Sequence, residues 1–438
     1  MAIAVIGGGF TGLTAALELA KAGKRVVVLE RGKALGGLAA GFPLHGTVLE
    51  CAYHHLFRTD TDILELADEL GVGSSVVWLP SSVGICKDGA IHPFSTPVDL
   101  LKLPLLPFLS RIRLGATIAF LRQRKDWRGL EDVSACDWMR RACGQRAYRL
   151  LWEPLLRGKF HEEAERISMA WLWARIHVRA RSNSGVGGER LAYFRGGFQV
   201  VIDGLERRLR ELSVEIKTGV SVRAIRPGDG GKGHAVETDG ETLKADAVIC
   251  TVPSHAFASF VDGHPVATAE YRKTLDAIRY LGAACLVWSS SQSLSPVYWL
   301  NVLDPEAPFL AFLEHTNLVS PDWYQGRRVF YAGAYIPHDH PTFVDPEDAV
   351  RERFFAHLRR MFPQFDASKI ETAKLFRFRN AQHVVDRGYP RRIPPVRTPI
   401  AGVYLSNFSQ VFPEDRGTNA AVRAGRQVAA MLLEDARA

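Results

Sequence analysis

Residues 295–318 place polar side chains inside otherwise apolar sequence, a pattern typical of a lined pocket. The segment reads SPVYWLNVLDPEAPFLAFLEHTNL, where Trp299, Asn301, Glu314 and His315 interrupt strand-like runs. Ordinary cores avoid such groups because buried polar atoms need partners, whereas pockets use them. A Glu-His pair could carry a proton during catalysis. Because neighbours on a strand point to opposite faces, we expect at most one of Glu314 and His315 to face a pocket.

The strongest pattern lies at the N-terminus, in MAIAVIGGGFTGLTAALELAKAGKRVVVLERGKALGG. The apolar run AIAVI predicts a buried parallel strand, and RVVVLE predicts a second one that ends in Glu30. Between them Gly7, Gly9 and Gly12 open a helix. Gly7 allows a tight turn, Gly9 lets a pyrophosphate approach the backbone, and Gly12 lets the helix pack closely on the strand. With Glu30 placed to accept hydrogen bonds from a ribose, the segment predicts a dinucleotide site.

A second glycine pair, Gly36-Gly37, follows Glu30 and extends this pattern. The extended pattern resembles the FAD-binding signature of the amine oxidase, phytoene desaturase and protoporphyrinogen oxidase superfamily, so the resemblance implies FAD as the cofactor. That family usually has Arg after the glycine pair, where this chain has Leu38. The FAD contacts implied in this region are Gly7, Gly9, Phe10, Thr11, Gly12, Glu30, Arg31, Gly36, Gly37 and Leu38.

Later segments extend the resemblance across the chain. Residues 194–225 look like the family's return to the FAD domain, with backbone groups of Val222 beside the adenine. Residues 214–253 alternate like a β-meander and end in an apolar strand followed by Thr251, near the flavin in the family. Residues 402–426 resemble the terminal motif, in which a strand and a helix start lie under the flavin ring. The contacts implied there are Asn407, Gly417, Thr418 and Asn419.

The implied architecture is an α/β fold with a discontinuous domain. A Rossmann-like FAD-binding domain, a parallel sheet with a β-meander, would be assembled from residues 1–75, 192–260 and 395–438. An interleaved α+β substrate domain would comprise residues 76–191 and 261–394. The N-terminus of the last helix, at Gly417–Asn419, would stabilise negative charge on the reduced flavin ring, because the first N–H groups of a helix lack partners within it.

The resemblance implies transfer of hydride from a substrate C–H bond to flavin, with an amine, a porphyrinogen or an isoprenoid as substrate. The long apolar segment 101–121 favours a hydrophobic substrate. The catalytic candidates are His54, Glu314 and His315, and the substrate-contacting candidates are Arg58, Lys159, Trp299, Asn301, Arg379 and His383. Arg58 could instead start the following helix, and His55 is better explained as a hydrogen-bonded core residue.

Because a flavin supplies the difficult chemistry, the protein needs no catalytic triad. The sequence indeed contains no GxSxG elbow, HExxH or P-loop. His338-Asp339-His340 lies between prolines without the remaining ligands of a metal set, so we interpret it as a turn and predict no metal.

Two other functions fit the same residues. The loop AYHHLFRTD and the Arg-rich region 377–392 also resemble UDP-galactopyranose mutases, which rearrange a nucleotide sugar without net redox change and need arginines for its diphosphate. Rab GDP-dissociation inhibitors resemble the fold but bind a prenylated partner without flavin chemistry. The intact glycines and Glu30 argue against that last class.

Composition narrows the partners and the location. The chain has 438 residues and a formal net charge of +8, but its basic residues are scattered in pairs and no nucleic-acid motif accompanies them. Six cysteines form no CxxC pair, which indicates buried thiols in a reducing interior. We find no signal peptide or spanning segment and expect a cytoplasmic protein. Residues 101–125, apolar with basic flanks, are either a core helix or a peripheral membrane contact.

Overall fold

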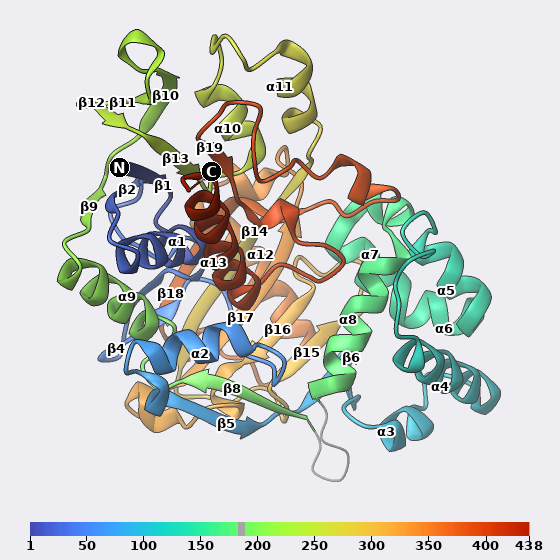
Figure 1. The fold of residues 1–438 in the computed structure, drawn as a ribbon. Coiled ribbons are helices and arrows are strands. Elements are labelled where there is room, and N and C mark those ends of the chain that lie inside the picture. The colour runs from blue at the N-terminus through green and yellow to red at the C-terminus, as the bar shows by residue number, and fades with distance from the viewer. Residues whose placement is uncertain (183–188, 438) are drawn as a thin grey trace.

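A five-stranded parallel sheet forms one half of the molecule (Figure 1). The computed structural model describes residues 1–182 and 189–437. The strands Ala2–Ile6, Ala247–Cys250 and Val403–Leu405 are short, mostly buried apolar runs, as strands covered on both faces require, whereas the edge strand Glu215–Thr218 is mostly polar and has no buried residue. In spatial order the strands are β19 (Val403–Leu405), β13 (Ala247–Cys250), β1 (Ala2–Ile6), β2 (Arg25–Glu30) and β9 (Glu215–Thr218). Strands β2 and β13 flank β1 on opposite sides, so the strand order reverses at β1. In open α/β sheets ligands bind at the carboxyl end of the strands at such a point, so we expect the ligand crevice at the end of β1.

Helices α1 (Phe10–Lys21) and α13 (Thr418–Asp435) lie side by side against this sheet, as Figure 1 shows. Their close approach depends on Gly425, where a Cβ atom would stand 2.5 Å from the Thr11 carbonyl oxygen. The predicted helices after Gly9 and Gly417 are therefore confirmed. The first and last segments of the chain meet in one layer.

The predicted β-meander is also present. Strands β10 (Val222–Pro227), β11 (His234–Thr238) and β12 (Thr242–Ala245) form an antiparallel three-stranded sheet, and β13 then returns the chain to the parallel sheet. The expected α/β class with a Rossmann-like half is thus confirmed.

A seven-stranded mixed sheet forms the other half. Helix α12 (Glu347–Met361) covers it, and Phe354 and Leu358 pack there with Trp288 and Phe330. All neighbouring strands are antiparallel except the parallel pair β15–β6. In spatial order the strands are β18 (Ile370–His383), β14 (Tyr280–Ser290), β17 (Arg328–Ile336), β16 (Ala311–Glu314), β15 (Trp299–Val302), β6 (Val83–Lys87) and β7 (Ala90–Pro93).

Helices to the right of this sheet in Figure 1 pack around a separate core. They are α3 (Pro97–Lys102), α4 (Phe108–Gln123), α5 (Ala135–Cys143), α6 (Gln145–Ala147), α7 (Glu153–Phe160) and α8 (Met169–Ser182). The remaining elements are β3 (Gly41–Leu44), β4 (Thr47–Glu50), α2 (Thr61–Glu69), β5 (Val76–Pro80), β8 (Arg190–Phe194), α9 (Gln199–Glu211), α10 (Ser254–Phe260) and α11 (Ala269–Asp276). In the described part of the chain, no helix combines the length and apolarity needed to cross a bilayer.

The two sheets take their strands from alternating stretches of the chain. One hydrophobic cluster nevertheless contains residues of both, including Val28 of β2 and Tyr331 of β17. The proposed division into residues 1–75, 192–260 and 395–438 against 76–191 and 261–394 stays a prediction.

Candidate active site

The turn after β1 has the geometry that the glycine pattern predicts. Gly7 has a φ of +114°, which side chains rarely adopt, and a Cβ there would stand 2.3 Å from Thr251 Oγ1. A Cβ on Gly12 would lie 2.0 Å from the Gly7 carbonyl oxygen. Thr251 itself is fixed because its N–H and hydroxyl both donate to the Ile6 carbonyl. Any larger residue at position 7 or 12 would force this turn open.

Helix α1 begins in a way that suits a phosphate. Its N-cap, Gly9, supplies no side-chain cap, and the first turn has no acidic residue. A Cβ at Gly9 would meet only the Cα of Gly37, at 3.9 Å. Gly36 runs alongside, pairs with Gly9, and donates its N–H to the Gly8 carbonyl at 2.8 Å. Free helical N–H groups bordered only by glycine form an anion site that fits a pyrophosphate.

Glu30 ends β2 beside this turn. One carboxylate oxygen accepts the Gly8 N–H and the other accepts the Gly32 N–H, both at 2.6 Å. A carboxylate has about four lone-pair positions, so acceptor capacity for ribose hydroxyls remains. Arg31, the next residue, is exposed, and Leu38 lies in the turn Gly37–Ala39.

Val222, whose backbone we expected beside the adenine, starts β10 and belongs to one hydrophobic cluster with Ile6 of β1 and Leu29 of β2. This position is near Glu30, whose carbonyl accepts the Val220 N–H at 3.0 Å. Phe10, by contrast, is buried in the core. Its predicted role in FAD binding can only come through its backbone.

Helix α13 also begins without a cap. Its N-cap, Gly417, has extended backbone angles of −172° and 172°, no acid follows in the first turn, and no atom would lie within 4 Å of a Cβ there. Gly417 is eight residues before Gly425, the residue against α1, so about 12 Å of helix separates the two positions. Two uncapped helix starts at such a spacing suit a ligand with a pyrophosphate at one end and an electron-accepting ring at the other.

Two other residues of the terminal motif turn out to fix the chain itself. Asn419 accepts the Ile63 N–H at 3.1 Å and so ties α2 to α13. Asn407 donates to the Val252 carbonyl at 2.8 Å and accepts from the N–H and the hydroxyl of Ser409. Its side-chain amide therefore holds the turn after β19, and its direct contact with the cofactor stays a prediction.

A cluster of charged groups stands directly before the start of α13. Asp415 accepts from Lys159 at 2.8 Å, from the Trp171 indole at 3.3 Å and from Arg175. Arg416 donates to the Tyr335 hydroxyl at 3.2 Å. We call these six residues the Asp415 cluster; it brings α7, α8, β17 and the α13 start together.

The cluster holds three cations around one carboxylate. Burial alone would raise the pKa of Asp415, but Lys159, Arg175 and Arg416 hold it well below its usual range. Burial lowers the pKa of Lys159, an effect that Asp415 opposes. Burial also works against ionisation of Tyr335, yet Lys159 and Arg416 hold the pKa of its phenol below the ordinary value. Asp415 is thus the anion, and positive charge remains in excess.

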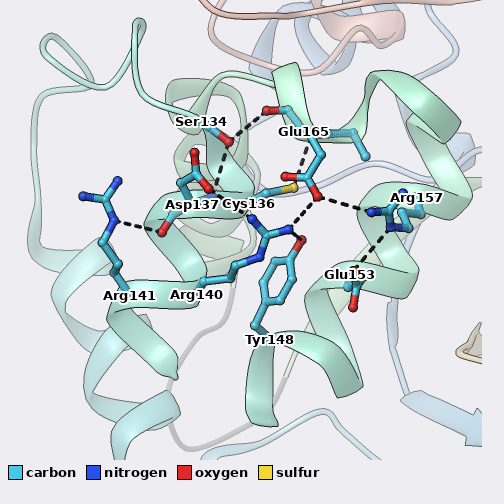
Figure 2. A network of polar contacts seen from close by, with 10 residues as sticks. Ser134, Cys136, Asp137, Arg140, Arg141, Tyr148, Glu153, Arg157 and Glu165 are labelled. Atoms are coloured by element: carbon cyan, nitrogen blue, oxygen red, sulfur yellow. Dashed lines mark hydrogen bonds and ion pairs between the residues drawn. The ribbon is translucent and has the colours of Figure 1, made fainter. Parts of the chain in front are cut away.

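A polar network in the helical region joins α7, the helix that carries Lys159, to α5 (Figure 2). Glu165 accepts from Arg140 of α5 at 2.5 Å and from Arg157 of α7 at 3.3 Å, which fastens α7 to α5. Lys159 lies in the last turn of α7, and its ammonium group is 4.9 Å from the ring centres of both Trp171 and Tyr335. The rings and Asp415 hold the cation in place.

An aromatic group borders the Asp415 cluster. Tyr53 and His55 come from the loop that follows β4, and Trp299 comes from β15. Tyr53 contacts Trp299 edge-on at 5.0 Å between ring centres, and it lies so close to Gly333 that a Cβ there would be 2.6 Å from its ring. His55 lies 5.8 Å from the Trp299 ring and hydrogen-bonds Tyr298. These neutral rings offer an apolar surface beside the cations.

His54 belongs to the same loop. Its Nδ1 donates to the Ala52 carbonyl at 2.8 Å, so Nε2 carries the lone pair. Burial lowers the pKa of His54 to about 4, and the pKa of His55 to about 3, so both rings are neutral near pH 7. His54 can therefore accept a hydrogen bond but is a weak base.

The loop is anchored at its start by Glu50. This carboxyl group accepts from the Tyr193 hydroxyl and the Phe198 N–H, each at 2.5 Å, and is 1% exposed. Burial raises the pKa of Glu50 to about 7. Glu50 links β4 to the segment that leads into α9.

The predicted pair Glu314 and His315 has a structural role, which corrects its assignment as catalytic. Glu314 is fully buried and accepts from the Ser293 hydroxyl and from the N–H groups of Leu294 and Ser295. His315 starts a 3-10 turn instead of continuing the strand, contacts the Tyr324 hydroxyl at 3.1 Å, and is buried. Both side chains are therefore inside the fold, and the expected alternation of faces does not apply.

Of the substrate candidates, the structure brings Lys159 and Trp299 to the site but not the two exposed arginines. Arg58 lies over the Trp78 ring and Arg379 over the Phe343 ring, both at the surface. Asn301 accepts from the Trp299 indole at 3.1 Å, so it orients that ring.

His383 ends β18 near the cluster and is completely buried. Its Nε2 contacts the Val411 carbonyl at 3.2 Å, and burial lowers its pKa to about 4. Two residues of the HDH sequence make local contacts: His338 meets the Arg379 carbonyl, and His340 accepts the Thr342 N–H. No group of three or more His, Cys, Asp or Glu side chains within the described residues is arranged to hold a metal ion.

The sequence did not single out most of the Asp415 cluster. Trp171, Arg175 and Tyr335 come from segments with no motif, and their proximity depends on long-range packing. The residues DRG before α13 were a usable signal, because an acid and an arginine directly precede a glycine N-cap.

Comparison with known proteins agrees with this geometry. A model of the family described as flavin containing amine oxidoreductase matches residues 10–433. The carotenoid phi-ring synthase of Streptomyces griseus is 28% identical over 60% of this chain, and a provisionally assigned flavin-containing monoamine oxidase of Mycobacterium tuberculosis is 26% identical over 62%. The chain spans 54% and 61% of the lengths of these two relatives.

Solved structures share the fold over nearly the whole chain. A provisionally assigned protoporphyrinogen oxidase from Exiguobacterium sp. 255-15 has a TM-score of 0.78, 18% identity and 99% coverage of both chains. A reduced UDP-galactopyranose mutase has a TM-score of 0.74 and 15% identity, with 99% and 95% coverage. At these identities the likeness concerns the fold alone. The family match and the two glycine-bordered helix starts together show that the chain belongs to the flavin-containing amine oxidoreductase family.

Proposed function

We propose that this enzyme removes hydride from a C–H bond of a largely apolar substrate that is neutral or anionic, such as an isoprenoid polyene or a carboxylate-bearing porphyrinogen, and not from an alkylamine. The observation that carries the proposal is the excess positive charge of the Asp415 cluster. Lys159, Arg175 and Arg416 surround a single carboxylate directly before the start of α13.

The cluster would oppose an ammonium group. At an effective dielectric constant of about 20, one uncompensated charge about 7 Å away costs a cation roughly 2 kcal/mol, and it favours a carboxylate by the same amount. His54 and His55 are both neutral near pH 7, so neither ring adds a charge that an ammonium group could pair with. A protonated amine would therefore meet in this cluster a single carboxylate, Asp415, already surrounded by Lys159, Arg175 and Arg416.

Different residues of the site would bind the apolar part and the anionic part of the substrate. Tyr53 and Trp299 offer ring faces and edges to an apolar skeleton. Arg175 retains 38% exposure of its side chain and is the cation best placed to receive an anionic substituent. FAD, when bound, would supply the hydride acceptor, and the uncapped start of α13 would stabilise negative charge on it.

Anaerobic bleaching of the flavin absorbance tests the substrate class. The purified holoenzyme is mixed with putrescine, benzylamine, a porphyrinogen and a polyene precursor in separate cuvettes. We expect bleaching by the porphyrinogen or the polyene precursor and none by the amines. Rapid bleaching by an amine would refute the proposal.

The geometry does not favour the two alternatives. In the Arg-rich region, Arg377 donates to two backbone carbonyls, while Arg391 and Arg392 pair with Asp132 and Asp386, so these arginines already have partners. Turnover of a nucleotide sugar only after flavin reduction would nevertheless establish a mutase. The family match likewise does not support the second alternative, a binding protein without flavin chemistry.

A further inference from the structure

Helices α3 and α4 expose an unusual concentration of large apolar side chains. Nine large hydrophobic residues are exposed in the part of the chain that the structure describes, and six of them lie between positions 98 and 120. Their exposure ranges from 44% to 79%. Single exposed residues are ordinary, whereas a concentration of this kind marks an interaction surface. The six residues, which we call the α3–α4 face, are Val98, Leu101, Phe108, Leu109, Ile112 and Phe120.

Helix α4 is held in the fold by its inward row, while in the outward row Phe120 also stacks on Trp138 of α5 at 6.2 Å between ring centres. Leu114, Thr117 and Leu121 form the inward row, and the two leucines pack in the core of the helical region. Phe108, Ile112 and Phe120 recur at multiples of four residues, which places them on one outer side. A helix that is apolar on two sides is expected to be covered on both.

The same segment carries positive charge, and within the described residues none of its basic side chains forms an ion pair with a carboxylate. Residues 97–125 contain six basic residues and a single acid, Asp99. Arg111 donates to the carbonyls of Leu101 and Leu106, and Arg113 donates to the Ala142 carbonyl at 2.8 Å. Because these partners are carbonyl groups, the guanidinium charges persist. The contacts also fix α4 to α3 and α5, so the face is rigid.

We propose that the α3–α4 face docks on the surface of a bilayer that contains anionic lipid. Phe108, Leu109 and Ile112 enter the boundary between headgroups and acyl chains, while the basic residues around them attract the lipid phosphates. The helices lie in the plane of the interface, consistent with α4 having only 16 residues. Charge complementarity selects the lipid surface over a second copy of this chain, which would bring the same positive charges together.

Flotation of the full-length holoprotein with vesicles tests the proposal. We expect binding to vesicles of phosphatidylcholine with about 30% phosphatidylglycerol, weaker binding to pure phosphatidylcholine, and release at high salt. The double variant Phe108→Ser, Leu109→Ser should bind about tenfold or more weakly, since it removes two exposed apolar groups from the contact. A matched control, Val266→Ser with Val344→Ser, removes two exposed apolar residues outside the face and should bind like the wild type.

A charge variant and a self-association measurement complete the test. Arg122→Glu with Lys125→Glu changes exposed residues and should weaken binding only to the anionic vesicles. Circular dichroism and the flavin spectrum establish that each variant is folded. The proposal fails if the wild type floats with neither vesicle, or if the Phe108/Leu109 variant floats as well as the wild type. It also fails if the wild type is a dimer that this variant converts to a monomer without any vesicle binding.

Discussion

Replacement of Gly417 by valine isolates the role of the α13 start in flavin binding. The backbone of Gly417 is extended, an ordinary conformation for valine, and no atom lies within 4 Å of the position of its Cβ. The free energy of unfolding of the apoprotein should therefore change by less than about 1 kcal/mol. Any larger effect must come from what the side chain does to the bound cofactor.

The expected loss can be stated for both affinity and potential. A helix start stabilises a partly buried negative charge by up to about 2 kcal/mol. If the valine moves the ring away and removes 1 to 2 kcal/mol from the reduced state, the two-electron potential falls by about 20 to 45 mV. The displaced ring should also weaken FAD binding by about tenfold or more, which corresponds to about 1.4 kcal/mol.

Titration of the apoprotein with FAD, followed by flavin fluorescence, gives the affinity, and anaerobic equilibration with a reference dye gives the potential. Gly240→Val is the matched control, because Gly240 also has open space around its Cβ and lies in the turn between β11 and β12. The control should behave like the wild type. An unchanged affinity and an unchanged potential in Gly417→Val would show that this turn is only a structural start of the helix.

Three further changes test other parts of the site. Gly12→Ala should abolish FAD retention, because its Cβ would lie 2.0 Å from the Gly7 carbonyl oxygen; the flavin absorbance of the purified protein measures this. Asp415→Asn should lower the free energy of unfolding in urea by about 3 kcal/mol, since it leaves the buried Lys159 without its carboxylate, and adding Lys159→Met should restore part of the loss. For Glu50, the raised pKa predicts a contribution to stability that is complete below pH 4.5 and falls by about 3 kcal/mol as pH rises to about 7; the difference in unfolding free energy between the wild type and Glu50→Gln measures it, because buried histidines such as His54 titrate in the opposite sense in both proteins.

Each of these expectations has a clear contrary result. A yellow Gly12→Ala protein would mean that the turn relaxes at little cost. Equal stability losses in Asp415→Asn with and without Lys159→Met would show that the two side chains do not interact. A difference in unfolding free energy between the wild type and Glu50→Gln that stays constant between pH 4.5 and 7 would show that Glu50 titrates normally.

The sequence predicted the cofactor half of the molecule well because its signals are local. A glycine that must adopt a φ of +114°, as Gly7 does, stands at a fixed distance from its strand and helix. The apolar strands and the meander are short-range patterns of the same kind. They could be interpreted without knowing what packs against them.

The substrate-binding half was harder to predict from the sequence, because an isolated polar residue in an apolar run has two explanations. It either lines a pocket or is a buried group that holds a loop in place. Glu314 and Glu50 both end apolar strands, and both prove to be buried groups that hold loops in place. Lys159 and Asp415 are 256 positions apart, and only the packing of α7 against the start of α13 joins them. No spacing rule predicts a contact of that range.

The last strand of the parallel sheet, β19, and the helix α13 come from the end of the chain, so they determine when the FAD site can form during synthesis. The strand and helix that complete the FAD site comprise residues 403–435, while the phosphate turn comprises residues 7–12. During synthesis the N-terminal turn emerges first and must wait for almost the whole chain before its partner helix exists. Cofactor loading is therefore a late event, and a chain interrupted before residue 403 would be both colourless and exposed along one edge of its main sheet.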